Sequence, residues 1–90
     1  MDSSEKRDLL FAMRDPDTWV VRLQYKDSKG VVTIRVVSPV RIEDDAVLAL
    51  CLAREECRLF KLEQVSQVEL VRSSDVLMPV EIITLEDQGK

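Results

Sequence analysis

The sequence predicts a mainly β domain: a small, strongly bent β-barrel of five or six strands preceded by one short N-terminal α-helix. The chain has 90 residues, which is the size of one domain. From residue 19 onward apolar and polar residues alternate, and turn signals separate the alternating runs at short intervals. A barrel also avoids the unpaired edges that an open sheet would leave. We therefore expect one domain over residues 1–90, with the barrel at about 19–71.

The helix is predicted over residues 4–14. Leu9, Leu10 and Met13 recur at helical spacing, so one face of this segment is apolar. A serine at its start can cap the first turn, and Arg14 at its end suits the helix dipole. Because a helix of about ten residues is marginal alone, we expect its apolar face to pack on the barrel.

The first hairpin is the clearest β element. One face of its first strand carries the apolar residues Trp19, Val21, Leu23 and Tyr25. Gly30 can take the positive φ that closes the following turn. The β-branched run 31–37 is predicted to return as the second strand. Pro39 has no backbone donor, so we expect the ladder to break and the chain to bend there.

The remaining strands follow at short spacing. The run Ala46–Ala53 is uncharged and apolar on both faces, which indicates a central strand covered on two sides. A fourth strand is predicted at 57–62 and a fifth at 67–71. Segment 76–85 contains Pro79 and is expected to be an edge strand or an extended tail. The last five residues are expected to be frayed.

Composition argues against several classes of function. A net charge of −4 and a pI of about 4.8 disfavour strong non-specific binding to nucleic acid. The longest uncharged run, 46–53, is too short to span a bilayer. The chain has no histidine, and we find no phosphate-binding glycine loop and no nucleophile beside a base. We therefore expect no enzymatic activity, no cofactor, no metal and no membrane insertion.

Two cysteines, Cys51 and Cys57, are expected to be buried free thiols. The first residues lack the apolar core of a signal peptide, which favours a reducing cytoplasm. Two thiols do not complete a zinc site by themselves. The acidic pairs at 44–45 and 55–56 are interpreted as solvated turns, because consecutive carboxylates rarely converge on one point.

The order of residues resembles the WYL domain of bacterial regulators. The resemblance runs over residues 9–71 and follows the series Tyr25, Gly30, Arg35-Val36-Val37-Ser38-Pro39, an acidic turn, an apolar strand and Arg58-Leu59-Phe60-Lys61-Leu62-Glu63-Gln64-Val65. In that family a Tyr-turn-Gly hairpin leads to an arginine-containing strand that ends in Pro-Leu. A Trp-Tyr-Leu triplet and an Arg-x-Phe-x-Leu-Asp-Arg-Ile segment follow. Here the triplet is replaced by Ala46-Val47-Leu48, and the second arginine of the last segment by Gln64.

The resemblance implies an Sm-like or SH3-like barrel that acts as a sensory or nucleic-acid-binding module in bacterial transcriptional control. Such domains commonly follow a DNA-binding helix-turn-helix, for which 90 residues leave no room. We therefore expect a WYL-like domain that works alone or as a fragment of a longer regulator.

The resemblance also implies that Arg35 and Arg58 contact an anionic ligand, which we expect to be a nucleotide or single-stranded nucleic acid. If the register brings them together, their guanidinium forks could hold a phosphate. Arg41 and Lys61 are candidates to extend the patch, and Tyr25 to stack a base. The alternative is that both arginines face solvent and pair with carboxylates while the aromatic rings fill the core.

The sequence is also compatible with a second class of function. A chain that lacks the Trp-Tyr pair can be a protein-interaction or dimerisation module that has lost the ligand site. It would dock through an exposed strand edge or through the apolar face of the helix.

Overall fold

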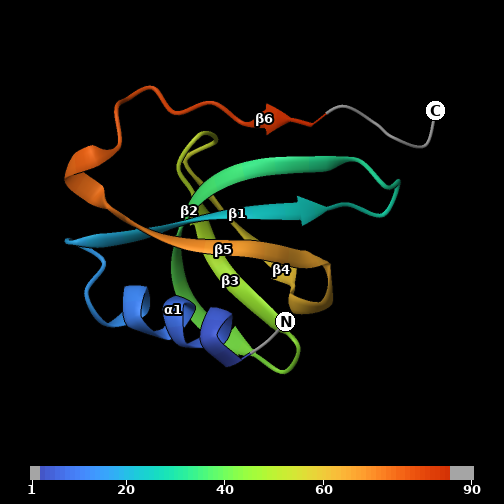
Figure 1. Ribbon diagram of the computed structural model, residues 1–90, viewed down its shortest axis with the longest axis horizontal. Helices are drawn as coiled ribbons and strands as arrows, with labels where there is room; N and C mark the ends of the chain where they lie inside the picture. Colours follow the sequence, from blue (N-terminus) through green and yellow to red (C-terminus); the bar gives the residue numbers. More distant parts are fainter. Residues whose placement is uncertain (1–2, 86–90) are drawn as a thin grey trace.

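The structure is a computed structural model that describes residues 3–85 (Figure 1). One helix, α1 (Ser3–Arg14), precedes an antiparallel sheet in the order β4-β3-β2-β1-β5, and β6 pairs with β2. The strands are β1 (Trp19–Lys26), β2 (Val32–Glu43), β3 (Ala46–Cys51), β4 (Glu56–Lys61), β5 (Val65–Arg72) and β6 (Ile83–Thr84). Two 3-10 turns are η1 (Leu62–Gln64) and η2 (Ser73–Asp75). The predicted mainly β class with an N-terminal helix is confirmed.

The sheet curves strongly, but backbone pairing does not close it. Between residues 3 and 85 no ladder joins β4 to β5, which are the two outer strands. The three-residue turn η1 leads the chain from the end of β4 to the free side of β1. There β5 pairs with β1 and not with β4. Side chains from both outer strands, Phe60 and Val65, fill the interior between them. The coarse prediction of a bent β-domain therefore holds, and a hydrogen-bonded closed barrel is not found.

The first hairpin forms as predicted. β1 pairs with β2 from Val21↔Val37 to Lys26↔Val32. In the turn, a carboxylate oxygen of Asp27 accepts hydrogen bonds from the backbone N–H groups of Lys29 (2.8 Å) and Val31 (3.0 Å). Gly30 has φ 88°, a conformation that favours glycine because it has no Cβ.

Asp27→Ala is expected to destabilise the domain by about 1 kcal/mol, because two turn N–H groups lose a charged acceptor and must turn to water. The free energy of unfolding in urea measures the change. Ser28→Ala in the same turn is the control, and its free energy of unfolding should stay within about 0.5 kcal/mol of the wild type. Equal effects of the two substitutions would show that the Asp27 carboxylate does not stabilise this turn.

β2 bends without breaking at Pro39. Its first half pairs with β1, its second half with β3, and Val37 takes part in both ladders. The register shifts between Pro39 and Arg41, which marks a bulge where the prediction placed a break. The proline fits because a bulge tolerates a missing donor. β6 pairs with Thr33 and Ile34, along the part of the edge that β3 leaves free.

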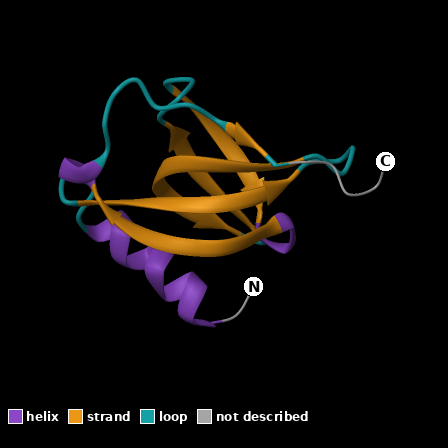
Figure 2. Ribbon diagram, turned by 45° about the horizontal axis from the view of Figure 1, so that its top comes forward, coloured by secondary structure: helices purple, strands orange, loops and turns teal. Residues whose placement is uncertain are grey.

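The helix covers the concave face of the sheet, and the C-terminal segment lies on the opposite side (Figure 2). α1 packs against β1, β2 and β5. Leu9 and Ala12 are fully buried and Met13 packs beside them, whereas Leu10 is exposed. The buried core consists of Leu9, Ala12, Val21, Leu23, Tyr25, Val37, Val47, Ala49, Phe60 and Val65.

Two predictions about burial are wrong, and both fail for the same reason. β3 is not covered on two sides: Val47, Ala49 and Cys51 are buried, and the alternate residues are only half-buried. Cys57 is exposed rather than buried, although Cys51 is a buried free thiol as expected. The helix covers one face of the sheet only, so the outer faces of β3 and β4 stay accessible to solvent. The predicted fraying of residues 86–90 lies outside the described residues.

Candidate functional site

In the first half of β2 the more polar residues face the core and the more apolar residues face outward. Thr33 and Arg35 are buried and point inward with Val37, whereas the more apolar Ile34 and Val36 are only half-buried and face outward. The register fixes this choice, because Arg35 lies opposite the fully buried Leu23 of β1. A polar pair is thus placed in the core, and an apolar pair on the outer face. Each side of β2 consequently carries a candidate site.

Arg35 is a buried cation without a counter-ion. The residue is 9% exposed, and no carboxylate of residues 3–85 forms a salt bridge with it. Its Nε–H donates to the hydroxyl of Thr33 at 3.0 Å. Its Nη1 is buried and has no hydrogen-bond partner in the described chain. Charged groups are rarely buried without a partner, because removing one from water costs on the order of several kcal/mol. The unsatisfied nitrogen of Arg35 therefore needs an explanation.

An aromatic ring joins this arginine to the second predicted anion contact. The guanidinium carbon of Arg35 lies 5.9 Å from the ring centroid of Phe60, and that of Arg58 lies 5.8 Å from the same centroid. Tyr25 meets Phe60 edge-on at 4.9 Å, and Arg35 lies 6.0 Å from the Tyr25 ring. We call these four residues the guanidinium cluster. Its two cations come from β2 and β4, which are not adjacent in the sheet.

The two arginines differ in access to solvent. Arg58 is exposed and forms no salt bridge with a described residue, whereas Arg35 is enclosed. Phe60, whose ring both guanidinium groups approach, is completely buried. The ring can therefore hold the cations by cation–π attraction but cannot stack a base. The expectation that the aromatic rings fill the core holds for Phe60 and Tyr25.

The other predicted site residues lie outside the cluster or play a packing role in it. Arg41 forms a salt bridge with Glu43 on the exposed end of β2. Lys61 is exposed at the end of β4, three residues after Arg58, so the two side chains point to opposite faces of the strand. Tyr25 is buried, and its hydroxyl donates to the side-chain oxygen of Gln64 at 3.4 Å. Gln64 thus contacts the cluster through this tyrosine.

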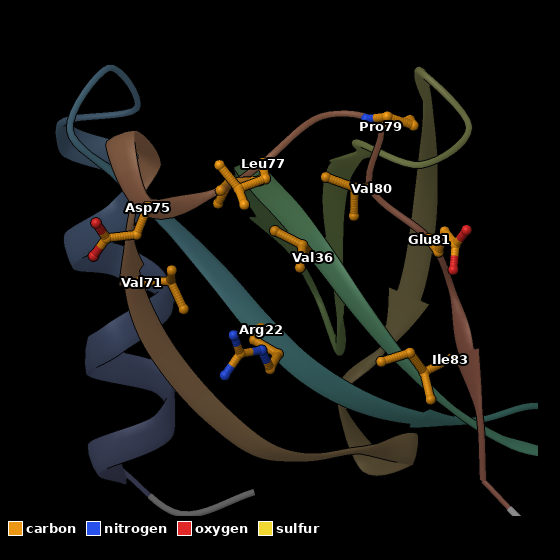
Figure 3. A pocket seen from close by; sticks show the side chains of 10 residues that line it. Arg22, Val36, Val71, Asp75, Leu77, Pro79, Val80, Glu81 and Ile83 are labelled. Carbon is orange, nitrogen blue, oxygen red and sulfur yellow. The ribbon is translucent and has the colours of Figure 1, made fainter.

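The sequence did not predict a cavity on the outer face of the sheet (Figure 3). It has a volume of about 370 Å³ and lies between the sheet and the C-terminal segment. The residues that line it are Arg22, Val36, Val71, Asp75, Val76, Leu77, Pro79, Val80, Glu81 and Ile83. A smaller hollow of about 240 Å³ shares Arg22, which forms a 3.0 Å salt bridge with Glu69. No periodicity in the sequence reveals that segment 76–83 arches back over β2.

Other chemical features give no further site. No group of three or more metal-ligating side chains converges anywhere in residues 3–85. No helix among these residues has the length and apolar character needed to cross a membrane. Comparison with protein-family models finds no match, and comparison with curated proteins finds no similar sequence.

Proposed function

We propose that this domain is a non-enzymatic regulatory module of bacterial transcriptional control that binds an anionic ligand, a nucleotide or single-stranded nucleic acid, at the guanidinium cluster. The observation that supports this proposal most directly is the buried Nη1 of Arg35, which lacks both a hydrogen-bond partner and a counter-ion among the described residues. A phosphate oxygen would satisfy that donor and offset the cost of burying the charge. Arg58, which is exposed and rests on the same ring, would meet the ligand first.

The shape of the sheet supports a WYL-like, Sm-like architecture for this module. β1 pairs with β5, the last long strand, and the bent β2 is shared by two halves of the sheet. Both features suit a small, strongly bent β-domain of this kind. Arg58 lies two residues before Phe60 on β4, and Arg35 of the non-adjacent strand β2 reaches the same ring.

The test is an amide-shift NMR titration with a short oligothymidylate and with inorganic phosphate. We expect saturable shifts around Arg35 and Arg58 that weaken with added salt, because phosphate binding releases counter-ions. Arg58→Ala should weaken the affinity by roughly tenfold, since it removes one charge-assisted contact. Arg41→Ala is the matched control, because that exposed arginine is held by Glu43 away from the cluster. Equal losses in the two variants would refute a site at the cluster.

A second candidate function, a protein-interaction or dimerisation module, is favoured by the exposed apolar surface. Leu10 and Phe11 on α1 are exposed, as is Leu59 on β4. β4 and β5 also leave one edge each unpaired within the described sheet. Light scattering over a range of protein concentrations tests dimerisation. A mass that stays monomeric at high concentration contradicts it, and a mass that doubles supports it.

A further inference from the structure

The C-terminal segment forms an arch that is attached to the sheet only near its two ends. At its start, the N–H of Ser73 donates to the carbonyl of Thr18, the residue before β1, at 2.8 Å. At its end, Ile83 pairs with Ile34, and the N–H of Leu85 donates to the carbonyl of Val32 at 2.9 Å. Between these points no backbone hydrogen bond joins residues 77–82 to the described part of the sheet. This stretch stands clear of the sheet and leaves the cavity beneath it.

The walls of this cavity are mainly aliphatic. Val36 and Val71 form the floor, and Leu77, Val80 and Ile83 form the roof and the far wall (Figure 3). Leu77 is 83% exposed and Ile83 is 54% exposed, so apolar surface beside the hollow remains in contact with water. A volume of about 370 Å³ lies within the range of small-molecule sites. An aliphatic ligand would remove this surface from water.

The charge of the lining residues favours an aliphatic ligand with a negatively charged group. Arg22 is the one cation among the described lining residues, and its side chain is 47% exposed. Its Nη1 donates to Glu69, which leaves further N–H donors of the guanidinium for a ligand. The carboxylates of Asp75 and Glu81 are directed away from the hollow in Figure 3. The interior thus offers apolar contact and one positively charged end.

We propose that this cavity is a second ligand site, which takes a small amphipathic carboxylic acid. The aliphatic body packs between Val36, Val71 and Val80, and the carboxylate binds Arg22. The site does not depend on the guanidinium cluster, because Val36 and Arg35 are neighbours in β2 and therefore face opposite sides of the sheet.

The probes are octanoate and the matched neutral alcohol 1-octanol, each titrated into the full chain and followed by methyl NMR. We expect saturable octanoate shifts confined to the methyl groups of Val36, Val71, Val80 and the neighbouring lining residues. Octanol should bind about tenfold more weakly, because it cannot form the charge-assisted contact. Shifts scattered over the exposed leucines, or equal affinities for both probes, would overturn the proposal.

Two exposed substitutions change the charge without touching the core. Arg22→Gln should reduce octanoate binding to the level of octanol, and Glu69→Gln should strengthen octanoate binding by removing the competing carboxylate. A dispersed amide spectrum verifies that each variant is folded. Unchanged octanoate affinity in Arg22→Gln overturns the proposal. Because Arg58→Ala leaves this cavity intact, the phosphate titration and the octanoate titration succeed or fail separately.

Discussion

Phe60→Ala is expected to lower the free energy of unfolding by about 3–5 kcal/mol. Phe60 is 0% exposed and has the largest volume among the fully buried side chains. It is also the only buried residue of β4, so its loss removes the apolar anchor of an outer strand. Total stabilities of small domains are about 5–15 kcal/mol, so the variant should be close to unfolding.

Urea unfolding followed by tryptophan fluorescence measures this effect. Leu59→Ala is the matched control, because Leu59 is the preceding residue of the same strand and is 54% exposed. Its free energy of unfolding should fall by no more than about 0.5–1 kcal/mol. Similar losses at the two positions would contradict the alternation of β4 and hence the placement of Phe60 in the core.

Elements set by local pattern were predictable from the sequence. The helix needs only the spacing of Leu9 and its neighbours, and the first hairpin only the period of two and the turn at Gly30. Features that depend on distant partners were not. Which face of β3 is covered depends on how the sheet curls around the shared core, and whether the sheet closes depends on where η1 directs β5. Neither is encoded within a window of ten residues.

The candidate site likewise has one part that the sequence predicted and one part that it did not. The family resemblance selected Arg35 and Arg58, and both lie within 6 Å of the Phe60 ring centroid. Hydrophobic patterning alone would have turned Arg35 toward solvent, because its neighbours Ile34 and Val36 are apolar. The core-facing residues of β1 override that preference and invert β2. The same inversion creates the apolar floor of the outer cavity, which no local pattern predicts.

Arg35→Met is expected to raise the free energy of unfolding by about 1–2 kcal/mol while abolishing phosphate binding. The methionine fills much of the same volume and removes the buried charge and its unsatisfied Nη1. The substitution also loses the hydrogen bond to Thr33 and the cation–π contacts with Tyr25 and Phe60, which together return only part of the desolvation cost. Substitutions that stabilise a fold and remove a function mark residues kept for binding.

Urea unfolding with and without phosphate separates the two effects of this substitution. Phosphate should stabilise the wild type by mass action, because it binds the folded state, and should leave Arg35→Met unchanged. Arg35→Lys provides the comparison: it keeps a charge but loses the planar fork, so it should gain no stability and bind phosphate weakly. A loss of stability in Arg35→Met would mean that the guanidinium is already satisfied in the folded chain. The guanidinium cluster would then need no anion, because Nη1 of Arg35 would not be missing a partner.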